Sequence, residues 1–204
     1  MEFSKRAERT GVNGLLVVTP YYNKGNENGI YEHYKAIAGA VKIPIILYNV
    51  PSRTGVNLSI SLLKKLAQIE NITALKEASG NISYVAEVAR EVPKLDIYSG
   101  NDDMVVPVLS LGGKGVISVS ANIIPDINHE MVVSFLNGDI EKARELQLKY
   151  NDLVNALFLE TNPVPIKEAM NFLGYEVGNC RLPLGMMEES NRAKLKDILI
   201  AHEV

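Results

Sequence analysis

The sequence contains a single cysteine, Cys180, among its 204 residues. One cysteine excludes a disulfide within the chain and provides no set of thiolates for a metal cage. It fits a reducing compartment, so we expect a cytoplasmic protein without a metal site. The sequence also lacks an apolar run long enough to span a bilayer, a secretory signal and a cationic run that would follow a phosphate backbone. We therefore expect neither a membrane nor a nucleic-acid partner.

The composition is that of a globular protein. The residues are 47% hydrophobic and 22% charged, and the formal net charge is −3, which is ordinary for folded domains. A chain of this length can form one large α/β domain, or one good core with an appendage.

Up to Gly138, five apolar runs alternate with amphipathic segments. The runs are rich in β-branched residues, which is typical of strands buried in a parallel sheet. The segments between them carry apolar residues at three- and four-residue spacing, as helices do. This alternation predicts right-handed βαβ units. The predicted strands lie at 15–19, 44–50, 72–76, 95–99 and 116–120.

After Gly138 the strands stop and only helical patterns remain. Asp139 is the predicted N-cap of a long helix that reaches Leu157. We therefore divide the chain into a partial barrel with the active-site strand ends, residues 1–138, and a C-terminal helical region, residues 139–204.

Two architectures combine alternating strands and helices, the doubly wound sheet and the (β/α)8 TIM barrel. A nucleotide-binding doubly wound sheet usually carries a glycine-rich phosphate loop after its first strand, whereas the glycine cluster 112–115 precedes a strand. In a barrel, functional residues gather at the carboxyl ends of the strands. Those ends are polar here, which favours the barrel; they lie at 19–22, 48–49, 76–77, 99–100 and 118–120.

Lys76 stands at the end of an apolar strand. Burial disfavours the charged ammonium of a lysine and makes a neutral amine available, which is the form that attacks a carbonyl to give a Schiff base. Taken alone, such a position more often holds a structural lysine whose stem is buried and whose ammonium reaches solvent. The residues at the other strand ends distinguish these interpretations.

Four motifs resemble those of one family. Residues 48–55 read YNVPSRTG, 19–22 read TPYY, 75–80 read LKEASG and 112–119 read GGKGVISV. In order and spacing they are similar to the motifs of the 4-hydroxy-tetrahydrodipicolinate synthase (dihydrodipicolinate synthase) family of pyruvate-dependent class I lysine aldolases. The resemblance implies an α/β fold of the (β/α)8 TIM-barrel type, followed by a helical region. The chain matches about the last five βα units and that region, so we expect an N-terminally truncated, incomplete barrel.

The resemblance implies a lyase that condenses pyruvate with aspartate semialdehyde in lysine and diaminopimelate biosynthesis, with no metal or organic cofactor. Lys76 would form an imine with pyruvate, Tyr48 would shuttle protons beside it, and Tyr22 would enter a neighbouring subunit's site across a dimer interface. Arg53 would bind the carboxylate of the semialdehyde as a planar bidentate donor. Two further residues, which match positions lining the pyruvate pocket, are Gly100 and Ile117.

Several alternatives stay open. A sister enzyme, such as N-acetylneuraminate lyase or a 2-keto-3-deoxy-sugar-acid aldolase, would share the lysine and tyrosine, but would be expected to lack a carboxylate-binding arginine at position 53. An inactive fragment that serves as an assembly module is the alternative from another class. Because a five-strand arc has two open edges, we expect a homo-oligomer, dimer or tetramer, or a complementing N-terminal fragment that covers them.

Plainer interpretations also exist for individual residues. Tyr48 alone would be a core tyrosine with a satisfied hydroxyl, and Arg53 alone would be a surface charge. Tyr21 is expected to be an interface aromatic. Asp102 or Asp103 is expected to cap a short helix instead of binding a metal.

Overall fold

The computed structural model describes residues 1–204 and contains two compact units. Unit 1 comprises Met1–Asn101 and Pro107–Ile117, and unit 2 comprises Asp102–Val106 and Ser118–Val204. All the strands belong to unit 1. Unit 2 is helical.

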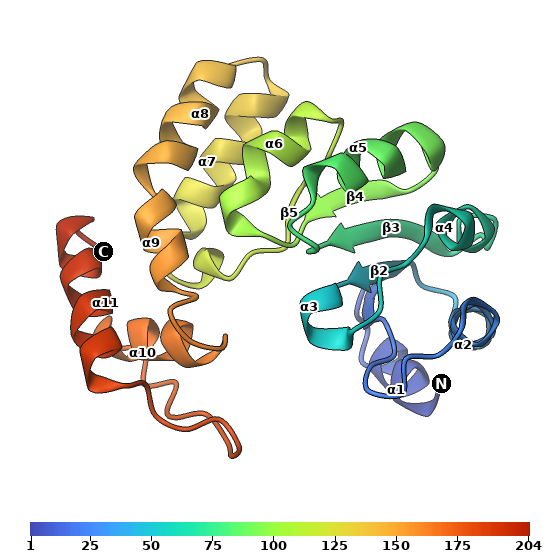
Figure 1. Ribbon diagram of the computed structural model, residues 1–204, viewed down its shortest axis with the longest axis horizontal. Helices are drawn as coiled ribbons and strands as arrows, with labels where there is room; N and C mark the ends of the chain where they lie inside the picture. The colour runs from blue at the N-terminus through green and yellow to red at the C-terminus, as the bar shows by residue number, and fades with distance from the viewer. The chain divides into compact units, whose positions relative to one another are not determined.

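Unit 1 is built on a parallel sheet whose five strands follow one another in chain order, β1-β2-β3-β4-β5 (Figure 1). Parallel neighbours need a crossover connection, and helices supply it, as the alternating sequence pattern predicts. The first and last strands each have a single neighbour, so the sheet has two unpaired edges. The strands are β1 (Leu15–Val18), β2 (Ile45–Asn49), β3 (Ile72–Glu77), β4 (Asp96–Ser99) and β5 (Gly115–Val116).

Helices alternate with the strands of this sheet along the chain. A helix precedes β1, and helices follow β1, β2 (two of them), β3 and β4. They are α1 (Glu2–Arg9), α2 (Glu27–Ala38), α3 (Pro51–Thr54), α4 (Ile60–Leu66), α5 (Ile82–Glu91) and α6 (Val105–Ser110), of which α6 begins in unit 2.

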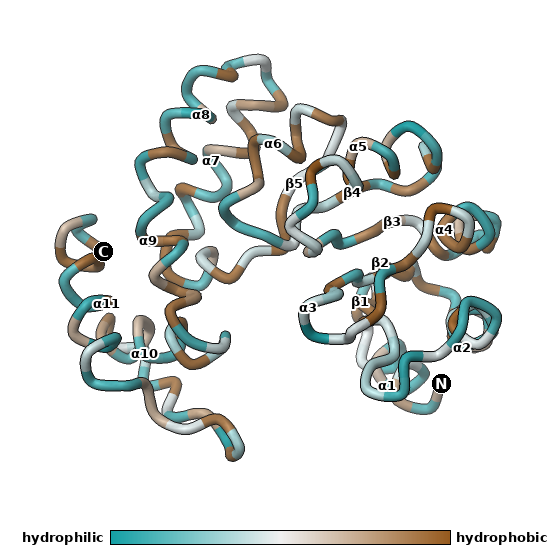
Figure 2. The backbone as a smooth tube through the Cα atoms, viewed as in Figure 1, coloured by the Kyte–Doolittle hydropathy of each residue, from teal (hydrophilic) through white to brown (hydrophobic).

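One face of the sheet forms the core of unit 1. Successive strand residues point to opposite faces, and the set that includes Leu47, Leu75 and Ile97 is buried. Apolar residues of α2, α4 and α5 are buried as well, and Figure 2 shows hydrophobic and hydrophilic residues on different sides of α2 and α4. The other face is less covered, because Leu16 and Val18 of β1 are 45% and 36% exposed.

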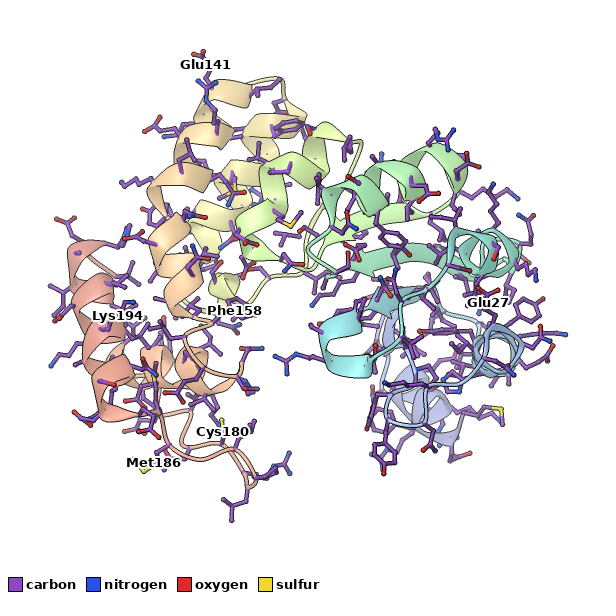
Figure 3. The ribbon with its side chains drawn as sticks, viewed as in Figure 1. Glu27, Glu141, Phe158, Cys180, Met186 and Lys194 are labelled. Atoms are coloured by element: carbon purple, nitrogen blue, oxygen red, sulfur yellow. The ribbon has the colours of Figure 1, made fainter.

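Side-chain caps fix where three of these helices begin. Asn26, Ser59 and Asn81 each accept a hydrogen bond from the backbone N–H three residues further on, at 2.9, 3.1 and 3.2 Å. Glu27, at the start of α2 (Figure 3), accepts hydrogen bonds from the hydroxyls of Ser59 and Ser61 and so ties the first turns of α2 and α4 together.

The last strand is shorter than the pattern 116–120 predicts. Pairing reaches Ile117, whose N–H donates to the carbonyl of Ser99 at 2.9 Å, and the chain then turns. Within unit 2, the Asp102 carboxylate accepts hydrogen bonds from the N–H groups of Val119 and Ser120 at 2.9 and 3.0 Å. The expectation that Asp102 caps the helix after it was wrong, because its carboxylate bonds the turn that ends the strand pattern.

Unit 2 is built from helices, one of which begins at a side-chain cap. Asp139 caps α8 by accepting from the N–H of Lys142 at 3.0 Å, as predicted. The single helix expected as far as Leu157 is two helices, because the chain leaves helical geometry at Tyr150 (φ −99°, ψ 8°). The helices are α7 (Pro125–Leu136), α8 (Ile140–Lys149), α9 (Asn151–Ala156), α10 (Val164–Phe172) and α11 (Glu189–Ala201).

Unit 2 contains the single cysteine of the chain. Cys180 lies in the irregular segment between α10 and α11 (Figure 3). None of the helices of the chain combines the length and apolar character that crossing a membrane requires. The boundaries of the two compact units lie at other residues than the boundary expected after residue 138. The division into regions 1–138 and 139–204 therefore stays a prediction.

Candidate active site

Lys76 and Tyr48 form the centre of the candidate site. They are register neighbours on β3 and β2, so the parallel pairing alone brings their side chains to the same face. The Nζ atom of Lys76 lies 4.4 Å from the ring centroid of Tyr48, within the range of a cation–π contact. Lys76 is only 9% exposed although it is the second-last residue of β3. The pattern of an apolar strand ending in lysine therefore does mark a buried amine.

Tyr48 is a half-buried tyrosine whose hydroxyl is influenced by two opposing effects. Burial raises the pKa of Tyr48, and the positive charge of Arg53 acts in the opposite direction. Because a tyrosine normally titrates near pH 10, a raised pKa keeps the hydroxyl protonated at neutral pH. Tyr48 can therefore donate a proton beside the Lys76 amine.

Arg53 lies on α3, the short helix that follows β2. The sequence builds this turn with Pro51 at the first helical position and with Gly55 in the left-handed region, φ 68°, at its end. The guanidinium is exposed, and its charge acts on Tyr48. The turn thus places a positive charge close enough to Tyr48 to act on its hydroxyl.

Gly100 forms a wall of the site by having no side chain. A Cβ atom at this position would lie 2.6 Å from Cβ of Ala78 and 3.1 Å from Cε of Lys76. Both distances are too short for an ordinary contact, so any larger residue would displace the lysine or its strand. The Gly100 N–H donates to the carbonyl of Glu77 at 2.7 Å, which fixes the backbone against β3.

Ile117 follows β5 and lies two strands away from Lys76. Its N–H pairs with Ser99, and its side chain is half-buried. The structure therefore places it at the same strand-end edge of the sheet as Gly100. Its predicted part in a pyruvate pocket stays a prediction.

Tyr22 stands apart from the other predicted residues. It lies in the loop between β1 and α2, is 88% exposed, and has a left-handed backbone with φ 66°. Positive φ is uncommon for a tyrosine and costs about 1–3 kcal/mol where it is held. Tyr21, beside it, is also exposed. Both rings are exposed, and their predicted places at a subunit interface stay predictions.

Lys24 links the loop of Tyr22 to the turn of Arg53. A Cβ atom at Gly55 would lie 2.7 Å from Cε of Lys24, so the lysine stem packs directly on that glycine. This contact keeps the loop after β1 next to the turn after β2.

Two residues that the sequence analysis gave no role lie directly beside the site. Asn49 and Glu77 are the residues after Tyr48 and Lys76, and their side chains are hydrogen-bonded to each other at 3.0 Å. The available signal was the presence of two polar residues at equal positions after two apolar runs. Hydrophobic periodicity could not show the register in which these two strands pair. That register brings the two side chains within hydrogen-bonding distance.

The structure arranges no group of three histidine, cysteine, aspartate or glutamate side chains that could hold a metal ion. The Asp102 carboxylate, which the sequence analysis considered for such a site, accepts two backbone hydrogen bonds through one of its oxygens. The side chains that the site does bring together are an amine, a phenol and a guanidinium.

Comparison with known proteins finds extensive similarity. The sequence profile of the Dihydrodipicolinate synthetase family matches residues 1–202. A 4-hydroxy-tetrahydrodipicolinate synthase of Brachyspira hyodysenteriae is 57% identical over 199 residues, which are 98% of this chain and 68% of that protein. One of Caldicellulosiruptor bescii is 58% identical over 201 residues, with the same coverage.

Solved structures extend this similarity to three dimensions. The dihydrodipicolinate synthase of Aquifex aeolicus superposes with a TM-score of 0.97 at 41% identity, over 99% of this chain and 70% of that one. The enzyme of Cyanidioschyzon merolae, solved with lysine bound, gives 0.95 at 42% identity over 99% of this chain and 69% of that one. These similarities confirm the predicted fold class, an incomplete (β/α)8 barrel of five units followed by helices.

Proposed function

The chain belongs to the dihydrodipicolinate synthetase family, and from this membership we propose that its site condenses pyruvate with aspartate semialdehyde through a Schiff base on Lys76. The product would be 4-hydroxy-tetrahydrodipicolinate, an intermediate of lysine and diaminopimelate biosynthesis. The observation that carries the proposal is the buried Lys76 amine, 4.4 Å from the ring of a register-paired tyrosine.

In the proposed reaction Lys76 acts as a nucleophile. Its neutral amine attacks the keto carbon of pyruvate, water leaves, and an imine forms. Loss of a proton from the methyl carbon gives an enamine, whose carbon attacks the aldehyde carbon of the semialdehyde while the aldehyde oxygen takes up a proton. The amino group of the semialdehyde then replaces Lys76 at the imine carbon, which closes the ring and releases the lysine. The protein supplies all groups for these steps, with no metal or organic cofactor.

Proton transfer is the proposed task of the tyrosines. Tyr48 is protonated at neutral pH, lies beside the amine, and can give and take back a proton during imine formation. Tyr22 is proposed to act in a neighbouring subunit, because its ring is exposed and its strained backbone holds it out from β1. Arg53 is proposed to bind the carboxylate of the semialdehyde, for which a guanidinium is the geometrically matched donor.

Arg53 also discriminates between the proposed activity and that of a sister aldolase. An enzyme that cleaves N-acetylneuraminate or a 2-keto-3-deoxy-sugar acid has no semialdehyde carboxylate to bind there. The relatives that are more than half identical to this chain carry the synthase name, which supports the same choice. As an enzyme of amino-acid biosynthesis the protein would act in the cytoplasm.

Assembly is part of the proposal because the sheet is open. Leu16 and Val18 expose apolar surface on β1, and β1 and β5 lack a second neighbour. The matched relatives are longer, with 68% of their length corresponding to this chain. We propose that these open edges are covered in the active protein, by a complementing fragment or within a homo-oligomer. The same open surface supports the second candidate, an inactive assembly module.

The experiment is a product assay with both substrates. The purified chain, alone and together with an N-terminal fragment of a relative, is incubated with pyruvate and aspartate semialdehyde, and also with N-acetylneuraminate and a 2-keto-3-deoxy-sugar acid. Condensation of the first pair alone supports the proposal. Cleavage of a sugar acid supports the sister aldolase, and a complex without any turnover supports the assembly module.

A further inference from the structure

A buried pair of polar side chains lies on the side of the sheet opposite to the Lys76 and Tyr48 side chains. Asn49 and Glu77 are the last residues of β2 and β3 and are register neighbours. Because successive strand residues point to opposite faces, they lie on the helix-covered face while Lys76 and Tyr48 lie on the other. Asn49 is completely buried and Glu77 is 3% exposed.

Hydrogen bonds from two directions hold the Glu77 carboxylate. The side-chain amide of Asn49 donates to its Oε1 atom at 3.0 Å, and the N–H of Ser79 donates to the same oxygen at 2.8 Å. Burial raises the pKa of Glu77, and the bonds from Ser79 and Asn49 act against that rise. Burying a carboxyl group costs free energy. A buried carboxyl next to the candidate nucleophile in the sequence is therefore a candidate for a functional role.

Asn49 also binds the turn that follows α3. Its Oδ1 atom accepts from the N–H of Leu58 at 3.1 Å, and its Nδ2 atom donates to Oδ1 of Asn57 at 2.8 Å. The carbonyl of Leu58 in turn accepts from the Tyr84 hydroxyl of α5 at 2.5 Å. Leu58 is therefore anchored through both backbone polar groups, and it ends the segment that begins with the turn of Arg53.

We infer that Asn49 and Glu77 are positioning residues for the reaction proposed above. The bond between them joins β2 and β3 one residue beyond Tyr48 and Lys76, so it fixes the separation of amine and phenol. The bonds from Asn49 to residues 57 and 58 fix where the segment carrying Arg53 returns to the sheet. One buried network thereby positions the nucleophile, the proton donor and the carboxylate-binding cation. Neither Asn49 nor Glu77 touches a substrate in this role.

The test measures the rate at which pyruvate becomes trapped on Lys76 by borohydride, together with the pH dependence of Lys76 acetylation by acetic anhydride. Asn49→Ala removes the link between the strands and the turn, and we expect trapping to slow by about 10- to 100-fold, since a misplacement of about 1 Å can cost about 10²-fold in rate. Glu77→Leu should act in the same way. Glu77→Gln keeps an oxygen that accepts from Asn49 and Ser79, so it should retain a rate within about threefold of the wild type.

A purely structural role would give a different result. Asn128, a buried asparagine of unit 2, makes a comparable set of hydrogen bonds with Ser120 and Ile124, so Asn128→Ala is the matched control. Thermal unfolding of each variant establishes its stability. The positioning role is refuted if Asn49→Ala and Asn128→Ala have the same effect on all three measurements, namely melting temperature, pyruvate trapping and the Lys76 acetylation profile. It is equally refuted if Glu77→Gln is as impaired as Glu77→Leu, because then the charge and not the bond geometry matters.

The acetylation arm separates this inference from the proposed function. If the wild-type chain traps no pyruvate, the Schiff-base proposal fails in this form of the protein. Acetylation still reports whether the titration of Lys76 shifts in Asn49→Ala and stays as in the wild type in Glu77→Gln. If Glu77→Leu does not fold, Asn49→Ala carries the test, and an unshifted profile in that variant overturns the inference.

Discussion

The Nζ atom of Lys76 lies 4.4 Å from the ring centroid of Tyr48, its register neighbour on the adjacent parallel strand. This relationship is produced by backbone pairing, because β2 and β3 each end one residue later and turn away from the sheet. The amine and phenol therefore face each other without any contribution from loops. The segments that follow the strands supply the other groups, Arg53 on α3 after β2 and Gly100 directly after β4.

Tyr48→Phe should distinguish the contribution of the Tyr48 ring from that of its hydroxyl. The ring contact with Lys76 is retained and the proton donor is lost, so trapping of pyruvate at neutral pH should slow by about 10²-fold or more, as for a lost general acid or base. Tyr34→Phe is the control, since the Tyr34 hydroxyl donates to the carbonyl of Val17. Equal rates in the two variants would show that the Tyr48 hydroxyl takes no part.

Gly100→Ala should disturb Lys76 directly. The added methyl group would lie 3.1 Å from Cε of the lysine and 2.6 Å from Cβ of Ala78, and overpacking of this kind costs about 1–3 kcal/mol. We expect a lower melting temperature and a marked loss of trapping. Gly185→Ala, where no atom lies within 4 Å of the new Cβ, should leave both unchanged. A Gly100→Ala protein that traps pyruvate like the wild type would disprove the close packing around the lysine.

Arg53→Ala should affect the two substrates differently. Imine formation with pyruvate should persist, because Lys76 and Tyr48 remain in place, whereas use of aspartate semialdehyde should fall about 10- to 100-fold, the worth of about 1.5–3 kcal/mol for a hydrogen bond to a charged group. Steady-state kinetics with the semialdehyde varied, in the assembled protein, measures this. Arg144→Ala on α8 is the control, and equal loss of both steps would argue against carboxylate binding.

The buried Glu77 carboxyl should make stability depend on pH. Its pKa is raised in the folded protein, so the folded state binds the proton more tightly than the unfolded chain does. Its contribution is therefore fully present below the unfolded pKa, near 4.5, and is lost as the pH rises through the folded value. Glu77→Gln cannot ionise, so its stability relative to the wild type should increase from pH 4 to pH 7. Denaturant unfolding at several pH values measures this difference, and a difference independent of pH would contradict the raised pKa.

The sheet could be predicted from the sequence because its strands are local patterns. Runs such as the one before Lys76 are continuous, β-branched and followed by polar residues, and alternation with amphipathic segments makes parallel order the natural outcome. Four of the predicted site residues, Tyr48, Arg53, Lys76 and Gly100, lie at the carboxyl ends of neighbouring strands or directly after them. Parallel strands bring their carboxyl ends together whatever their side chains are.

What could not be predicted depends on contacts between distant residues. The strand after Gly115 ends early because Asp102 binds the N–H groups of Val119 and Ser120 from 17 and 18 positions away. The helix after Asp139 breaks at Tyr150, whose ring stacks on His202 at a centroid distance of 5.1 Å. Neither partner is indicated by hydrophobic periodicity, which reports only which face of an element is buried.

The most direct test of the account is to locate the covalent adduct. The purified protein is incubated with pyruvate and borohydride, digested, and every lysine-containing peptide is weighed by mass spectrometry, with Lys76→Arg as the control. The account predicts a reduced pyruvate adduct on Lys76, absent from the Lys76→Arg protein and from the exposed lysines. An unmodified Lys76, or an adduct spread over surface lysines, would contradict it.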